Sequence, residues 1–159
     1  MKQILLYGFL LLTMLNGFAQ NSLNKQEKEA IISEVQGMLN NYHDAIVKGG
    51  INEGLKYLDH SSDFFWVPPR YTEALDYDTV KDILLENSGD VKFIDFSWEK
   101  VQIVPITHSV TNYTGIVKCV EVDKNNQPMT FRIIESGTLI KRDDGWKFLS
   151  GQTRNLPKH

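Results

Sequence analysis

The stretch ESGTLIKRDDGWKFLSGQTR, residues 135–154, carries the strongest structural signal in the sequence. Two strand-like runs flank Asp144-Gly145, and a large aromatic residue, Trp146, follows the turn directly. An Asp-Gly step between alternating apolar residues is a strong signal for a β-hairpin, because glycine tolerates the positive φ that a tight turn requires. The chain is therefore predicted to end in a long antiparallel hairpin.

The segment before this hairpin also has the pattern of extended strands. Alternating apolar residues separated by turn residues predict four long strands, over residues 91–104, 108–122, 128–142 and 146–154. Apolar residues occupy both parities of residues 108–122, so both faces of that strand are expected to be covered.

The N-terminal half has helical periods instead. Apolar residues recur at helical spacing from Lys25 to the stop at Gly49-Gly50, and a short second helix is predicted over 51–58. A short aromatic strand, 64–67, must end at the prolines that follow, because proline cannot donate to a sheet ladder.

A third helix begins near Asp76 or Asp78, either of which can cap it, and ends at Asn87. Helices first and long strands afterwards predict an α+β fold, with three N-terminal helices packed on a curved antiparallel sheet.

The first nineteen residues are predicted to be a signal peptide. Lys2 is the only charge before an apolar run, and the small residues that a signal peptidase recognises precede Gln20; an uncleaved anchor is the alternative. The only cysteine is Cys119, so no cysteine can carry a lipid anchor, and its place in a strand indicates a buried, inert thiol. We expect a secreted or periplasmic protein with a single domain, residues 20–159.

The charge pattern indicates no nucleic-acid or membrane partner. The formal net charge is −3, and lysine and arginine are mixed with aspartate and glutamate, so no basic stripe forms. His60 and His108 are expected at the surface, as are His43 and Asp44 on the first helix. No spacing of histidines and carboxylates predicts a metal site, and we expect no cofactor.

The order of these elements, together with particular residues, resembles the nuclear transport factor 2-like (NTF2-like) superfamily, and within it the SnoaL-like or DUF4440-type domains. The resemblance covers nearly all of residues 20–159. It rests on Tyr42 with Ala45, Gly49-Gly50, residues 63–66, Tyr77-Asp78, Gly137-Thr138 and residues 144–148. It implies a cone-shaped fold with a mostly apolar pocket open at one end, and frequent homodimers packed through the outer face of the sheet.

The resemblance also implies where chemistry would be found. Ketosteroid isomerases of this superfamily pair a tyrosine on the first helix with an aspartate base and a protonated acid on a later strand. Tyr42 has the place of the tyrosine, and Glu135 lies near the place of the acid, with Ser136 or Gly137 equally possible. The base position falls on Pro68, so the isomerase mechanism loses its base.

The last strand gives a second test of the resemblance. Many SnoaL-like domains have two inward histidines there, whereas the matching inward positions here are Ser150 and Gln152, after Trp146 and Phe148 and before Arg154. Gln152 can hydrogen-bond a ligand, but it cannot take a proton at neutral pH.

Glu135 is the most informative of the polar candidates. If its side chain points inward, it is a buried carboxylate with a raised pKa, but the strand's parity alone does not decide its direction. An ion pair with Arg154 is an alternative. Arg70 could hold an anionic ligand or only a neighbouring acid. The predicted ligand-binding residues are Tyr42, Trp66, Arg70, Tyr113, Glu135, Phe148, Gln152 and Arg154, and the catalytic candidates among them are Tyr42 and Glu135.

Three functions fit the sequence. The first is an exported, non-catalytic domain that binds a small apolar or aromatic molecule. The second is a SnoaL-like isomerase, cyclase or dehydratase with rearranged residues, in which Glu135 is the acid or base and Tyr42 polarises a carbonyl. The third is a dimeric interaction module whose cone is filled by its own side chains.

Overall fold

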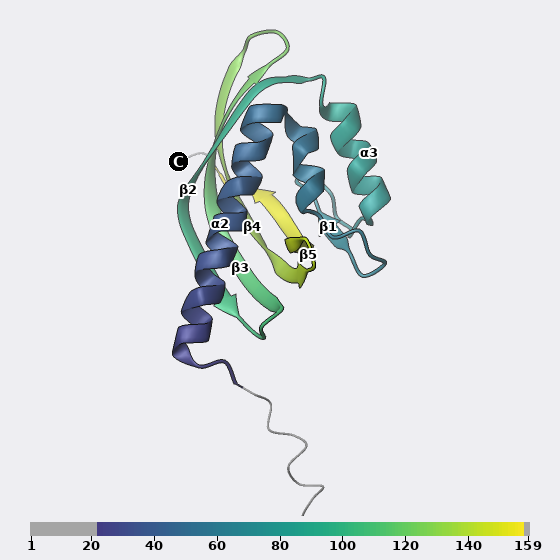
Figure 1. Ribbon diagram of the computed structural model, residues 1–159. Helices are drawn as coiled ribbons and strands as arrows, with labels where there is room; N and C mark the ends of the chain where they lie inside the picture. Colours follow the sequence, from purple (N-terminus) through teal and green to yellow (C-terminus); the bar gives the residue numbers. More distant parts are fainter. Residues whose placement is uncertain (1–21, 158–159) are drawn as a thin grey trace, which may run out of the picture.

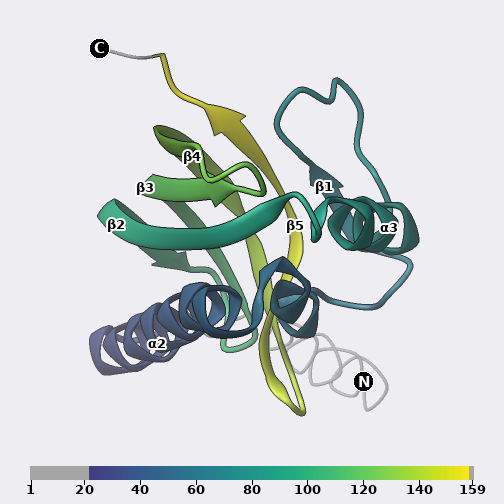
Figure 2. The same ribbon diagram turned by 90° about the horizontal axis from the view of Figure 1, so that it is seen from above.

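The computed structural model describes residues 22–157, so the predicted signal peptide lies outside the described residues. The elements in chain order are α2 (Lys25–Gly49), the 3₁₀ helix η1 (Ile51–Tyr57), β1 (Phe65–Val67), α3 (Tyr77–Asn87), β2 (Val91–Pro105), β3 (Val110–Asp123), β4 (Pro128–Arg142) and β5 (Gly145–Asn155). Figure 1 shows α2 lying across one face of the sheet, and Figure 2 shows α3 beside β1 at the far edge.

The predicted α+β fold is confirmed, with two refinements. The second helix is a 3₁₀ helix, and the sheet order β1-β5-β4-β3-β2 includes one parallel pair, β1 with β5, beside the four antiparallel strands. The turn that joins β4 to β5 is formed by Asp143 and Asp144, one residue earlier than the predicted Asp144-Gly145 step. Gly145, the first residue of β5, has a positive φ of 115°, which glycine tolerates.

Side-chain caps fix where the two α-helices begin. Asn24 and Glu27 form a capping box at the start of α2, with each side chain bonded to the other residue's backbone N–H. Asp76, rather than Asp78, caps α3 by accepting from the Thr79 N–H at 2.9 Å. Gly50 follows α2 with a φ of 90°, so the predicted stop is confirmed.

The core lies between α2 and the concave face of the sheet. Buried apolar residues of α2 meet the inward parity of the strands, which includes Tyr113 on β3, Leu139 on β4 and Phe148 on β5. On β3 this inward parity also contains Val117 and Cys119, both fully buried, so the predicted inert thiol is in the core. The other parity faces outward and is only partly covered in the single chain.

Candidate functional site

A cavity of about 220 Å³ lies between the helices and the concave face of the sheet. Aliphatic and aromatic side chains from α2, η1, α3 and four strands make most of its wall, and its polar members are few. The lining residues are Tyr42, His43, Ile46, Ile51, Gly54, Leu58, Trp66, Pro68, Pro69, Val80, Ile83, Leu84, Phe96, Ile133, Glu135, Phe148 and Thr153.

Among the residues that the structure describes, Glu135 is the one carboxyl group in this wall. Only 6% of the residue is exposed, and the Tyr113 hydroxyl donates a hydrogen bond of 2.6 Å to Glu135 Oε1. Burial raises the pKa of Glu135 from 4.5 to about 7, while hydrogen bonds from Tyr113 and Thr153 act in the opposite direction. The inward placement that strand parity left undecided is therefore settled: Glu135 faces the cavity.

Thr153, rather than Gln152, is the residue of β5 that faces the cavity. Ser150 pairs with Thr138 while Phe148 pairs with Leu139, so Leu149 is an extra residue in β5 and forms a β-bulge. A bulge inverts the alternation beyond it. The prediction that Ser150 and Gln152 point inward is therefore wrong, because that prediction assumed an unbroken period of two residues.

Trp66 links this side of the cavity to β1. Its ring lines the cavity next to Phe148, with ring centroids 5.7 Å apart, and its Nε1–H donates to Thr153 Oγ1 at 3.2 Å. Gly151 makes this approach possible, because a Cβ at that position would lie 2.5 Å from the Trp66 ring.

His43 is a cavity residue that the sequence analysis placed in solvent. It is only 6% exposed, and its ring stacks against those of Phe96 and Trp98, with centroids 4.8 Å from each. Burial lowers its pKa from 6.5 to about 4, so the imidazole is neutral at pH 7. The missed signal was its spacing, four residues after Leu39 and three before Ile46 on the buried stripe of α2.

Tyr42 also lines the cavity, as predicted, and packs edge-on against Phe148 with ring centroids 4.9 Å apart. Burial and the nearby Glu135 raise its pKa far above its ordinary value. Tyr42 therefore keeps its proton and can act only as a neutral hydroxyl.

The other predicted ligand-binding residues have different places. Tyr113 is buried behind Glu135, and Arg70, Gln152 and Arg154 are exposed. Arg154 pairs with Ile134, whereas Glu135 pairs with Thr153, so Arg154 and Glu135 point to opposite faces of the sheet. The alternative of an Arg154–Glu135 ion pair is therefore wrong. Arg70 follows the cavity-lining prolines and has a φ of 77°, which is uncommon outside glycine.

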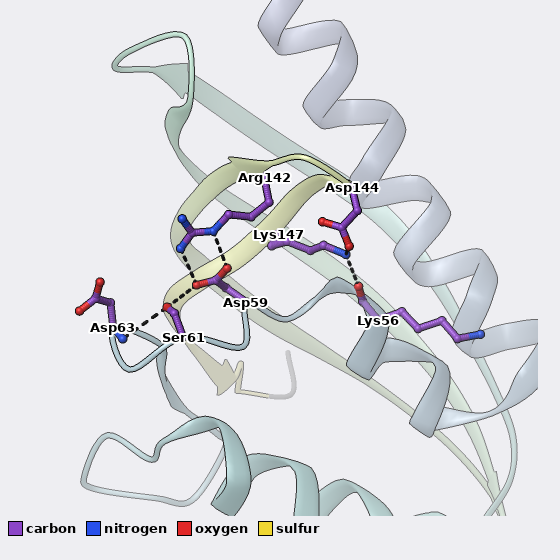
Figure 3. Close-up of polar contacts among 7 residues, drawn as sticks. All are labelled: Lys56, Asp59, Ser61, Asp63, Arg142, Asp144 and Lys147. Carbon is purple, nitrogen blue, oxygen red and sulfur yellow. Dashed lines mark hydrogen bonds and ion pairs between the residues drawn. The ribbon is translucent and has the colours of Figure 1, made fainter.

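Polar contacts at the hairpin hold one side of the cavity in place (Figure 3). Asp59 is 4% exposed and accepts two hydrogen bonds from Arg142, at 2.7 and 2.9 Å, and its backbone N–H donates to the Phe148 carbonyl at 2.9 Å. Lys147 donates to the Lys56 carbonyl at 2.6 Å. These contacts attach the segment after η1, and with it the cavity wall, to the terminal hairpin.

The described residues give two further facts about ligands and surroundings. Within residues 22–157, no group of three histidine, cysteine, aspartate or glutamate side chains is placed to hold a metal ion. In the same part of the chain, no helix has the length and apolar character needed to span a membrane.

Comparison by sequence finds no matching family model and no matching curated protein. Comparison by structure finds several solved relatives in fold. A provisionally assigned scytalone dehydratase from Novosphingobium aromaticivorans superposes with a TM-score of 0.74 at 12% identity, over 84% of this chain and 89% of that one.

Two further solved structures have the same arrangement. An NTF2-like superfamily protein from Salmonella enterica gives a TM-score of 0.69 at 15% identity, over 82% of this chain and 94% of its own. The hexachlorocyclohexane dehydrochlorinase LinA-type3 from Novosphingobium barchaimii gives 0.67 at 13% identity, over 84% and 92%. This chain therefore has the NTF2-like fold, as the sequence resemblance implied.

Proposed function

We propose that this domain binds a small, largely apolar molecule in the cavity beneath α2 and α3, without catalysing a reaction. The observation that carries the proposal is an apolar cavity of about 220 Å³ to which residues 22–157 contribute a single carboxyl group, that of Glu135. Small-molecule sites typically combine apolar walls with a few polar groups that orient the ligand. The absence of a base at Pro68, where the resemblance would place one, favours binding over turnover.

Filling the cavity tests this proposal. Ile83 lines the cavity from α3, and Leu85 is exposed on the same helix. Ile83→Trp should abolish binding of small aromatic compounds, measured by NMR titration, whereas Leu85→Trp should bind them as the unaltered protein does. Equal binding by both variants would place the ligand elsewhere.

We also propose a second candidate, a proton-transfer enzyme acting on the same bound molecule. It is favoured by a carboxyl group with a pKa of about 7 in the cavity wall, together with the neutral imidazole of His43. Glu135 would remove a proton from carbon next to a carbonyl, and the Tyr42 hydroxyl would donate a hydrogen bond to the oxygen that becomes negative. The names of two fold neighbours, a dehydratase and a dehydrochlorinase, refer to eliminations, which also involve proton removal.

Turnover distinguishes the two candidates. If the domain is an enzyme, Glu135→Gln should lower turnover of an enolisable ketone by about 100-fold or more. Exposed Glu86, on α3, offers a matched control, since Glu86→Gln makes the same chemical change outside the cavity. The absence of turnover in the unaltered protein over a panel of enolisable ketones would leave the binding function.

Export is proposed from the first nineteen residues. Expression in a bacterium with a periplasm should give a mature protein that begins at Gln20, which N-terminal sequencing can establish. A full-length protein retained in the cytoplasm would contradict export.

We further propose that two copies pair through the outer face of the sheet, and that the pair is a binding protein rather than an interaction module. The outward parity carries exposed Val104 and the partly covered Ile116 and Ile134, apolar groups that a second copy would cover. Ile134→Lys should then convert a dimer into a monomer in light-scattering measurements. A monomeric unaltered protein would contradict the proposal.

A further inference from the structure

The hydrogen bonds on this side of the cavity are donated toward Glu135 and the neighbouring Thr153. An indole N–H can only donate, so Thr153 Oγ1 is the acceptor in its 3.2 Å contact with Trp66 Nε1. Thr153 lies opposite Glu135 in the β4–β5 ladder, and its hydroxyl hydrogen remains free because the contact with Trp66 uses the oxygen. The Tyr113 hydroxyl donates to Glu135 at 2.6 Å. One hydroxyl hydrogen therefore points at the carboxyl group, and a second hydroxyl group lies on the neighbouring strand beside it.

This arrangement makes the polar end of the cavity a hydrogen-bond acceptor. An ionised carboxylate has about four acceptor positions and no donor, and the Tyr113 hydroxyl occupies one of them. Because Glu135 lines the cavity, its remaining acceptor positions are available to a bound ligand. No lysine or arginine is among the described residues that line it, so nothing cationic there would attract an anion to this end.

We propose that the ligand is a neutral aromatic compound carrying a hydroxyl group, and that this hydroxyl donates to Glu135. The inference rests on the proposed binding function and names the ligand class for that same cavity. The aromatic part fits a wall in which the rings of Tyr42 and Trp66 each pack edge-to-face against Phe148. An acceptor-only ligand such as an ether leaves the carboxylate unpaired, and an anion meets a like charge in a poorly solvated site.

The preference for a hydroxyl donor over an acceptor-only ligand depends on the charge of Glu135, because the titratable groups near it stay neutral. The titratable groups around it are Tyr113 and Cys119 on β3 and Tyr42 on α2, and burial raises the pKa of all three, so they stay neutral. His43, the remaining titratable group of the cavity wall, is also neutral above about pH 4. The groups of α3 and β5 in the wall, Val80, Ile83, Leu84, Phe148 and Thr153, do not titrate. Above about pH 7 the carboxylate accepts only, and below it the added proton makes it able to donate as well.

The test compares phenol with anisole, which have the same ring but differ in the hydroxyl hydrogen. At about pH 8.5, NMR titration of the full domain should show phenol binding at least about tenfold more tightly than anisole, because the lost bond is to a charged acceptor. Benzoate should bind no more tightly than anisole. At about pH 5.5 the ratio of phenol to anisole should fall to about threefold or less, as Glu135 takes up its proton.

Variants identify the group responsible. Glu135→Gln offers an amide that both donates and accepts, so the ratio at about pH 8.5 should fall to about threefold or less, while Glu86→Gln should keep the tenfold ratio. The unaltered protein's ratio decides the question even if Glu135→Gln does not fold. Equal binding of phenol and anisole by the unaltered protein would overturn the inference but leave the binding function standing. If neither binds, the binding of small aromatic molecules is itself wrong, and the inference fails with it.

Discussion

The two buried titratable groups of the cavity should have opposite effects on stability between about pH 4.5 and 6.5. The folded-state pKa of Glu135 is raised from 4.5 to about 7, so folding favours its protonated form. The resulting stability is fully present below pH 4.5 and is lost as the pH rises to about 7. A difference of this size corresponds to about 3 kcal/mol in the free energy of unfolding.

His43 has the reverse sign. Its folded-state pKa is lowered from 6.5 to about 4, so folding favours the neutral imidazole. The stability from His43 is present above pH 6.5 and is lost as the pH falls to about 4, again by about 3 kcal/mol. In the shared window the two contributions cancel, so the unaltered protein should have a nearly flat profile there.

Substituting Glu135 or His43 singly should reveal the pH dependence of stability that the other group causes. Glu135→Gln removes the falling contribution, so its free energy of unfolding should rise by about 2 kcal/mol from pH 4.5 to 6.5, the part of the His43 effect that falls in this window. His43→Phe keeps a ring between Phe96 and Trp98 and removes the rising contribution, so its stability should fall by about the same amount. Urea unfolding followed by circular dichroism measures both, with Glu86→Gln as the control. Parallel profiles for all four proteins would mean that neither Glu135 nor His43 is buried in the folded protein, contrary to the structure.

Three further predictions concern the surroundings of the cavity. Arg142→Met leaves the buried Asp59 carboxylate without its cation, so urea unfolding at pH 7 should show a loss of about 2 kcal/mol, discounted for the partial exposure of Arg142. This loss should shrink as the pH falls through the lowered pKa of Asp59, whose stabilising effect is present only above it. Gly151→Ala places a Cβ 2.5 Å from the ring of Trp66, so tryptophan fluorescence should change and stability should fall by about 2 kcal/mol; unchanged values would contradict the close approach. The Cys119 thiol is fully buried and its pKa is raised to about 12, so a thiol reagent should react at least about 100-fold more slowly with the native protein than in urea, and rapid native labelling would contradict its burial.

Local signals in the sequence were sufficient to predict the order of elements. The turn around Asp144, the Gly49-Gly50 stop and the cap at Asp76 each act over only a few residues, so their structural meaning is readable without the rest of the chain. The strands carry enough alternating apolar residues to mark their bounds. Because these local signals agree with one another, the fold followed from their order.

The site was only partly predictable, for two different reasons. His43 lies on the buried stripe of α2, and its spacing from Leu39 and Ile46 contained that information; the error came from treating a polar residue as exposed. The contact between Tyr113 and Glu135, in contrast, depends on the register between β3 and β4, which pairs Tyr113 with Gly137 rather than with the residue it contacts. No property of either segment alone fixes that register.

The bulge at Leu149 connects the fold to the chemistry of the cavity. If β5 paired with β4 without the bulge, alternation would place Gln152 beside Glu135, and an amide there could both donate and accept, so the polar end would have no fixed direction. With the bulge, Thr153 lies opposite Glu135 instead, and its oxygen accepts from Trp66 while its hydrogen remains free. The bulge in the terminal hairpin therefore determines which polar side chain stands beside the carboxyl group that the proposed ligand would meet.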